Sequence, residues 1–460
     1  MSAVTLMRSA VSQTSEGRSQ RQIGERWVRA LSLVAVTVAT WMLCTLMGGT
    51  WMFVARNMHP HEALVAMEQN LGQPISLPYV FLALFASVLL VPSLLGLLTQ
   101  AARVNLGGRE EHLAVLRLIG ATAGEVRGMM ILESLRQALV GLVLGSVLYV
   151  VTCPAWSLLT LQERRVGTWE IFTWWVIPAA WIVVLVLASC SVWLALRRVA
   201  VTPLGVTKKI PPKGQSVITL VLSVVGAVLL YRTLGSLTIT DAQAFAGMLV
   251  VAGGILTVNA LIAVGVIQLL ARLSYRVPGA ANYVATRRVG RGAKTTWKRV
   301  TALYFVAFIG GIGSWLSAVP EIEDQPALHM ITSDISSGVV ITVVFAAVLM
   351  VSSTLLTQAL SVVEQKQLTK SLYFIGAPAS FHTKVAVREV GVPMLVVSLL
   401  GFGMGSLMGT IMVVVHVNVM DKLVLFGALV VVALIGCVLA VLGTGRLREQ
   451  VLLGMGRAND

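Results

Sequence analysis

The chain has 460 residues, of which 57% are hydrophobic and only 12% are charged, and its formal net charge is +15. Ordinary soluble domains are ~25% charged, so the composition excludes a soluble protein and predicts an all-α integral membrane protein. In such a protein the positive charge indicates basic cytoplasmic loops, and we expect no nucleic-acid partner.

Ten apolar runs are each long enough to cross a bilayer as a helix, which takes ~20 residues. In chain order they cover residues 30–55, 79–101, 129–152, 172–196, 215–234, 244–270, 300–319, 335–362, 390–415 and 423–445. The chain before the first run is polar and basic, without a short apolar core and cleavage site. We therefore expect the first span to act as the insertion signal.

Lys and Arg residues are distributed unevenly between the two sets of loops that ten spans create. Of the 35, 29 fall on one side, in residues 1–29, 102–128, 197–214, 271–299, 363–389 and 446–460. Basic loops remain in the cytoplasm. The sequence therefore predicts a multi-pass protein of the bacterial cell membrane, with an N-terminal segment (1–29) and a tail (446–460) that are both cytoplasmic.

The segment LLTQA occurs twice, at residues 97–101 and 355–359, and each copy ends an apolar run. Further residues then match in the same order: Gly120 with Gly376, Glu133 with Glu389, and Gly145 with Gly401. Upstream, the W-x-R pattern of residues 27–29 recurs at 297–299. The shared order indicates a duplication. It predicts two parallel four-helix repeats, 30–196 and 271–445, joined by two extra helices within 197–270.

A charged stretch follows the second span of the first repeat, with the sequence REEHLAVLRLIGAT at residues 109–122. Leu113, Leu116 and Ile119 recur at helical spacing, and Gly120 stands where such a helix would end. The second repeat has EQKQLTKSLYFIGAP, residues 364–378, in the same place. Each stretch predicts a short amphipathic cytoplasmic helix. An interfacial anchor would explain one such helix, whereas its recurrence favours a shared role such as docking a partner.

These stretches also carry a family resemblance. A charged start followed by AVLRLIGAT after the second of four spans resembles the signature of the FtsX-like permease family, which includes MacB-type and lipoprotein-releasing permeases. The order of four, two and four spans is similar to the BceB-type branch. The resemblance implies the permease subunit of an ABC-type transporter, with one separate ATPase subunit docked on each repeat. It assigns ATPase docking to Arg109, Glu110, Glu111, Leu113, Leu116, Arg117, Ile119, Gly120, Gln367, Leu368, Leu372, Ile375 and Gly376.

The chain departs from this family in its outer loops. Members usually carry a large extracytoplasmic domain, and residues 320–334 are too few to form one. The resemblance therefore implies export or extraction of an amphipathic or lipid-like substrate that enters from the bilayer. The alternative is an ATP-independent transporter or a membrane-embedded sensor. A secondary transporter favours ionisable residues at mid-membrane, of which the sequence has few, and a sensor would need an outer domain.

Patterns for catalysis or cofactor binding are weak. The segment GRGAKTT at residues 290–296 has Ala293 before its lysine, and Arg288 where a phosphate-binding loop begins with Gly. The four cysteines form no C-x-x-C pair. We therefore expect no catalytic site, no metal site and no cofactor in this chain, and ATPase activity only in a partner.

Glycines are spaced four residues apart in the third and ninth spans: Gly141 and Gly145, and then Gly401, Gly405 and Gly409. This spacing places them on one helix face, where a neighbouring helix can approach closely. Packing inside the bundle is the simpler interpretation of this pattern. A moving contact between the two halves of the chain is the alternative.

Overall fold

The computed structural model describes residues 3–71, 75–106, 123–200, 217–235, 242–318, 326–364, 371, 375–376, 379–412 and 418–445. Within these parts eight helices are long and apolar enough to cross a membrane, and two further apolar segments, Val176–Cys190 and Ile218–Leu230, are shorter. Each of the ten predicted spans coincides with a helix. The predicted all-α integral membrane protein is therefore confirmed.

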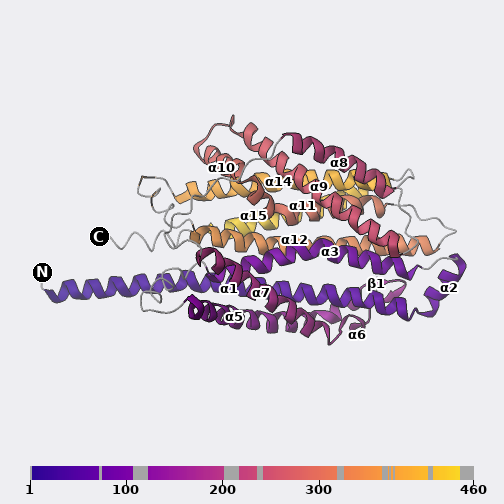
Figure 1. Cartoon of the computed structure of the whole chain (residues 1–460), viewed down its shortest axis with the longest axis horizontal. Helices are drawn as coiled ribbons and strands as arrows, with labels where there is room; N and C mark the ends of the chain where they lie inside the picture. The colour runs from indigo at the N-terminus through magenta and orange to yellow at the C-terminus, as the bar shows by residue number, and fades with distance from the viewer. Residues whose placement is uncertain are drawn as a thin grey trace.

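The first half of the chain contains four long helices (Figure 1). They are α1 (Ala3–Met58), α3 (Ser76–Leu106), α5 (Ala123–Thr152) and α7 (Val176–Ala200). A short helix, α2 (Glu62–Leu71), connects α1 to α3. Between α5 and α7 lie a 3-10 helix, η1 (Cys153–Leu158), the paired strands β1 (Thr160–Leu161) and β2 (Arg164–Arg165), and α6 (Thr168–Ile171).

The second half also contains four long helices, preceded by a helical hairpin and an amphipathic helix. The hairpin consists of α8 (Val217–Gly235) and α9 (Ala242–Ser274), and the amphipathic helix is α10 (Ala280–Arg291). The four long helices are α11 (Ala293–Leu316), α12 (Pro326–Glu364), α14 (Ala379–Met412) and α15 (Met420–Gly443).

Several helices begin earlier than the apolar pattern predicts, among them α12 and α1. Helix α12 starts at Pro326 rather than at 335, and Pro suits the first turn because its missing N–H would be unpaired there in any case. Helix α1 starts at Ala3, so the polar segment before the first span is helical as well. At 1.5 Å per residue its length is ~84 Å, and Figure 1 shows it extending well past the other helices.

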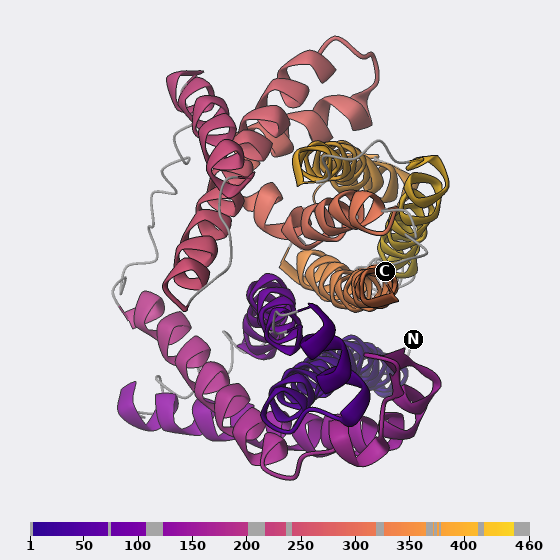
Figure 2. The same cartoon turned by 90° about the vertical axis from the view of Figure 1, so that its right-hand side faces the viewer.

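The long helices form two bundles that lie side by side (Figure 2). In the first bundle α1 packs against α3, α5 and α7, and in the second α11 packs against α12, α14 and α15. The bundles meet where α12 packs against α1 and α3. The α8–α9 hairpin joins the second bundle through contacts of α9 with α10, α11 and α14. A duplicated four-helix unit would produce this matched arrangement, and the duplication itself stays a prediction.

The two ends of the molecule differ in what they carry. Helix α1 begins and α15 ends at one end, on the left in Figure 1, which we call the terminal end. Helices α2 and α6 and the β1–β2 hairpin lie at the opposite end, which we call the hairpin end. Because the spans alternate in direction, α3 and α12 both run from the hairpin end to the terminal end.

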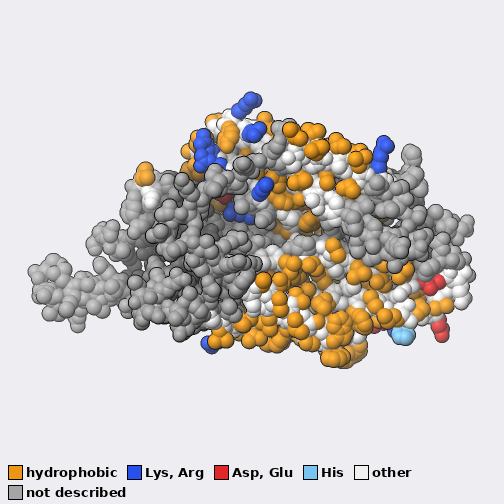
Figure 3. All heavy atoms as spheres, in the orientation of Figure 1, with side chains coloured by type: hydrophobic (Ala, Val, Ile, Leu, Met, Phe, Trp, Pro, Cys, Tyr) orange, Lys and Arg blue, Asp and Glu red, His pale blue; other side chains and the backbone are white. Residues whose placement is uncertain are grey.

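The surface of the described residues is broadly apolar around the middle of the bundle (Figure 3). Leucine, isoleucine and valine side chains are largely exposed on α5, α8, α14 and α15, as at Ile218 and Leu399. A soluble protein rarely exposes so much contiguous apolar surface, whereas lipid tails cover it in a membrane. Inside, one cluster of buried apolar side chains extends through both bundles.

Candidate functional site

Helices α3 and α12 make the largest contact between the two bundles, and we call this contact the seam. Each of the two helices carries one copy of the repeated LLTQA segment. Leu97 and Ala101 on α3 are buried, as are Leu356 and Ala359 on α12. The repeated segment therefore contributes to the surface through which the halves meet.

A polar contact fastens the seam close to the terminal end. The side-chain oxygen Oε1 of Gln100 accepts hydrogen bonds from Ser353 Oγ at 3.0 Å and from Thr357 Oγ1 at 2.8 Å. Hydrogen bonds between membrane helices contribute ~0.6–2 kcal/mol each. Gln100 belongs to the first LLTQA copy, and Thr357 belongs to the second, so the two copies contact each other directly.

Aromatic side chains add a second contact between the halves. The ring of Phe345 on α12 lies 5.7 Å from that of Trp41 on α1 and 5.8 Å from that of Trp156 in η1, measured between centroids. Such aromatic pairs contribute ~0.5–1.5 kcal/mol beyond the area they bury. Phe345 therefore anchors the second half against two elements of the first.

At the hairpin end the seam is fastened by a carboxylate. Oxygen Oδ2 of Asp334 on α12 accepts a hydrogen bond of 2.7 Å from the Tyr79 hydroxyl on α3. The same oxygen accepts one of 2.8 Å from the backbone N–H of Gln162, at the tip of the β1–β2 hairpin. Asp334 is 7% exposed. One carboxylate of the second half therefore joins two separate elements of the first half.

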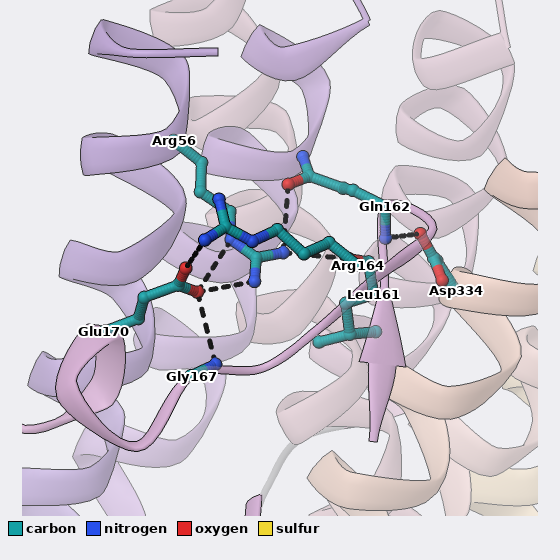
Figure 4. Close-up of polar contacts among 7 residues, drawn as sticks. All are labelled: Arg56, Leu161, Gln162, Arg164, Gly167, Glu170 and Asp334. Atoms are coloured by element: carbon teal, nitrogen blue, oxygen red, sulfur yellow. Dashed lines mark hydrogen bonds and ion pairs between the residues drawn. The ribbon is translucent and has the colours of Figure 1, made fainter. Parts of the chain in front are cut away.

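The β1–β2 hairpin is held in place by Arg56, the last basic residue of α1 (Figure 4). The buried Arg56 guanidinium donates hydrogen bonds to Glu170 Oε2 at 2.5 and 3.1 Å, and to the carbonyl oxygen of Leu161 at 2.8 Å. A longer bond of 3.4 Å reaches Gln162 Oε1. Arg164 also lies 3.4 Å from Glu170. Arg56 thus links α1, the hairpin and α6 into one polar cluster next to Asp334.

The hairpin tip has an uncommon backbone conformation. Gln162 and Glu163 have φ values of +59° and +58°. A two-residue hairpin with a type I′ turn has positive φ at both central positions, and Asn-Gly usually supplies it because other residues incur a cost of ~1–3 kcal/mol each. Gln162 is 1% exposed, and among the described residues its side-chain nitrogen has no hydrogen-bond partner. The contacts with Arg56 and Asp334 hold this conformation in place.

Helix α2 is tied to the start of α3 through Glu68. Oxygen Oε1 of Glu68 accepts hydrogen bonds from the backbone N–H groups of Ile75 and Ser76, both at 2.9 Å, and from the Ser76 hydroxyl at 2.8 Å. Partial burial raises the pKa of Glu68. The hydrogen bonds from Ser76 and Ile75 lower it by more than burial raises it, so the pKa lies below the usual 4.5. The carboxylate thus pairs N–H groups that a helix start leaves unsatisfied.

The predicted glycine faces lie inside each half. A Cβ at Gly145 would lie 2.6 Å from Thr40 Cβ on α1, and a Cβ at Gly401 would lie 2.6 Å from the Tyr304 carbonyl oxygen on α11. A Cβ at Gly405 would overlap the Phe308 carbonyl oxygen. Gly141 and Gly409 face Val36 and Trp315 at equally short distances. The structure therefore places the five glycines where α5 approaches α1 and α14 approaches α11, away from the seam.

A partly exposed ion-pair cluster lies near the terminal end of the second half. Glu389 on α14 pairs with Arg288 of α10 at 3.2 Å and with Arg299 of α11 at 3.4 Å. Glu389 matches Glu133 of α5, and Arg299 matches Arg29 of α1, in the duplication that the sequence predicts. The side chains of Glu133 and Arg29 lie outside the described part of the chain.

Most of the residues predicted to dock an ATPase lie outside the described residues. This holds for all eight from Arg109 to Gly120 and for Gln367, Leu368 and Leu372. The described Ile375 is 82% exposed, and its N–H donates to the Ser371 carbonyl in the manner of a helix. Gly376 follows with φ +91°, a conformation that commonly ends a helix. The assignment of these residues to ATPase docking stays a prediction.

The comparison with protein families identifies part of the first half. Residues 84–204 match the family described as FtsX-like permease C-terminal. This range runs from α3 through α5 to α7 and includes the stretch from Arg109 to Gly120. The comparison with curated proteins finds no match.

The fold and this match define a multi-pass membrane permease of the ABC-transporter class, which is a transporter component rather than a catalytic enzyme. The match confirms the predicted resemblance to the FtsX-like permease family over residues 84–204. Members of this family work with an ABC ATPase partner.

The polar cluster at the hairpin end did not emerge from the sequence. The sequence predicts that residue 334 ends an outer loop, and it assigns no contact to Arg56 or Arg164. The structure corrects this, because Asp334 lies within α12 and Arg56 is buried. The one available signal was an acidic residue directly before a predicted span, where an unpaired charge is unfavourable.

Proposed function

We propose that the chain is the permease subunit of an ABC-type transporter, in which a separate ATPase drives the export or extraction of an amphipathic or lipid-like substrate. The observation that carries this proposal is the FtsX-like permease match over residues 84–204, which includes the predicted docking stretch between α3 and α5. The apolar outer surface is consistent with a substrate that enters from the bilayer.

The connectivity of the seam suggests how ATPase movement reaches the spans. Helix α3 ends at Leu106, directly before the first docking stretch, and α12 ends at Glu364, directly before the second. The two helices that form the seam are thus the ones that continue into the two docking stretches. When two ATPase subunits approach each other, they would move the terminal ends of α3 and α12 and shift the halves along the seam.

The orientation proposed for the chain places the terminal end in the cytoplasm of a bacterial cell. Single cysteines in a variant without the four native cysteines test this orientation. Trp169→Cys lies on an exposed residue at the hairpin end and should react with a membrane-impermeant maleimide on intact cells. Ala280→Cys, exposed at the terminal end, should react only after permeabilisation. The reverse pattern would contradict the orientation.

The docking stretches are tested by placing a carboxylate on their apolar faces. Leu116→Asp and Leu372→Asp should each reduce ATPase capture when the tagged chain is purified from native membranes, and the double variant should abolish it. An unpaired charge in a desolvated contact is unfavourable. The matched controls, Leu116→Ile and Leu372→Ile, should capture the ATPase normally. If the double variant inserts and still captures and stimulates the ATPase in full, the stretches are interfacial anchors and the proposal fails.

A further inference from the structure

The segment that joins α9 to α11 carries a concentrated positive charge. Residues 271–299 contain eight Lys and Arg residues and no Asp or Glu. The structure brings Glu389 of α14 to this segment, where it is already paired with Arg288 and Arg299. Like charges at short range repel one another unless an anion lies among them. An anion bound among the other basic side chains of the segment would lower this repulsion.

Helix α10 places two of these basic residues in a row on one of its faces. Tyr283, Arg287 and Arg291 are spaced four residues apart, so they lie on one helix face, and all three are exposed. The opposite face buries Ala285, Thr286 and Val289 against the bundle. The Arg287 guanidinium lies 5.2 Å above the centre of the Tyr283 ring. This contact orients Arg287, and because it uses the face of the guanidinium, the N–H groups at the edge can still bind an oxygen ligand.

Basic side chains from the neighbouring helices extend this row of α10 residues into a larger basic surface. Four basic residues there are exposed: Arg272 at the end of α9, Arg276 just after it, Lys294 at the start of α11 and Arg388 on α14. Helix α10 packs against both α9 and α14. Figure 3 shows Lys and Arg side chains gathered over this part of the molecule. We call these four residues, together with Tyr283, Arg287 and Arg291, the α10 surface.

Apolar and aromatic side chains lie beside the charges. Leu273 lies at the end of the membrane-spanning part of α9, which ends at Ser274, and Tyr275 and Val277 follow it; all three are 41–55% exposed. Tyrosine is favoured at the level of the lipid headgroups, where its ring is apolar and its hydroxyl is hydrated. The α10 surface thus lies where the hydrocarbon layer ends, and it offers cations and apolar contacts together.

We propose that the α10 surface binds an anionic phospholipid of the leaflet at the terminal end. Arg287 and Arg291 would bind the phosphodiester and the anionic headgroup, and Tyr283 and Val277 would contact the upper acyl chain. A soluble anion would satisfy the charges but would leave Leu273 and Val277 exposed to water. A bound lipid would anchor α10, and with it the start of α11, at a fixed depth. The proposal requires a membrane-embedded chain and does not depend on the ATPase partner.

The test measures thermal stability and binding of the full chain in detergent. Phosphatidylglycerol is titrated against phosphatidylcholine, with inorganic phosphate alone as a third arm. We expect phosphatidylglycerol to raise the Tm and the other two arms to leave it unchanged. In Arg287→Gln/Arg291→Gln the affinity for phosphatidylglycerol should fall about 30-fold, as the loss of two basic side chains at an anionic surface implies.

Two control variants decide what the result means. Arg165→Gln/Arg232→Gln removes the same charge from exposed positions outside the α10 surface and should bind phosphatidylglycerol normally. Arg287→Lys/Arg291→Lys keeps the charge and should retain most of the affinity, which guards against misfolding of the Gln variant. An equal response to phosphatidylcholine or to phosphate would overturn the proposal. So would normal lipid binding by the Gln variant, or an equal loss in the Arg165/Arg232 variant.

Discussion

The hydroxyl of Tyr79 donates a hydrogen bond of 2.7 Å to the carboxylate of Asp334, although the two residues are 255 positions apart in the chain. Tyr79 lies near the start of α3, the second long helix of the first half, and Asp334 lies near the start of α12, the second long helix of the other half. Their contact fastens the hairpin end of the seam. It also fixes the Gln162 turn, because that turn donates its backbone N–H to the same oxygen.

Tyr79→Phe is expected to lower the stability of the contact between the halves. The substitution keeps the ring but removes one of the hydrogen bonds to a buried carboxylate, and an underpaired buried group costs about 1–3 kcal/mol. The measurement is the Tm in detergent. Tyr283→Phe, which alters an exposed hydroxyl, should leave the Tm unchanged. Equal Tm values for the two variants would show that the Tyr79–Asp334 bond does not stabilise the fold.

Gly405→Ala is expected to destabilise the second bundle. A methyl group at Gly405 would overlap the Phe308 carbonyl oxygen on α11, and backbone cannot move aside as a flexible side chain can. We expect a loss of about 1–3 kcal/mol, measured as a lower Tm. Gly403→Ala provides the control on the same helix, because nothing lies within 4 Å of its added Cβ. A Tm that falls equally in both variants would point to helix composition instead of close packing.

The duplication predicts an ion pair between Arg29 and Glu133 in the first half, because Arg299 and Glu389 pair at 3.4 Å in the second. In a double-mutant cycle, Arg29→Gln and Glu133→Gln should couple by about 0.5–1 kcal/mol, the range for partly exposed pairs. The Arg299→Gln and Glu389→Gln cycle serves as the positive reference. As a negative control, the effects of Arg21→Gln and Glu133→Gln on stability should be additive. If the effects of Arg29→Gln and Glu133→Gln are additive, these two residues do not form the ion pair that Arg299 and Glu389 form in the second half.

Stability should decline at acid pH through Glu68. Its folded-state pKa lies below 4.5, so the stabilisation is present above the unfolded value of 4.5 and is lost as the pH falls through the lower folded value. The Tm of the unsubstituted chain, followed from pH 6 to pH 3.5, should therefore fall more than that of Glu68→Gln. Parallel curves for the two proteins would show that the α2–α3 connection does not depend on the Glu68 charge.

The spans could be predicted from the sequence because lipid imposes both length and apolar composition on them. The residues at which the helices begin and end could be predicted less accurately. Thr332, Ser333 and Asp334 look like loop residues, yet they continue α12, and Tyr79 and Gln162 satisfy the Asp334 carboxylate. The polar start of α1 has no apolar periodicity, so its helix left no sequence signal.

The polar contacts of the seam were beyond sequence reasoning for a different reason. Periodicity reports on neighbours within a few turns, whereas Arg56 pairs with Glu170 across 114 positions and Gln100 with Ser353 across 253. The duplication identified both LLTQA copies without indicating that they face each other. The glycine spacing predicted close approach, and it could not specify that α1 and α11 are the partners.

Two polar contacts hold the seam, that of Tyr79 with Asp334 and that of Gln100 with Ser353 and Thr357. They are separated by about the thickness of the hydrocarbon layer. Tyr79 and Gln100 are separated by 21 residues of α3, or ~32 Å of helix, close to the ~30 Å of the layer. Both fastenings therefore lie near the levels where water meets the lipid. There a broken hydrogen bond can be exchanged for one to water at a net cost of ~1 kcal/mol, whereas a polar group freed in mid-membrane has no such replacement. Hydration at its two ends would therefore lower the cost of separating and closing the seam, which the proposed coupling to an ATPase requires.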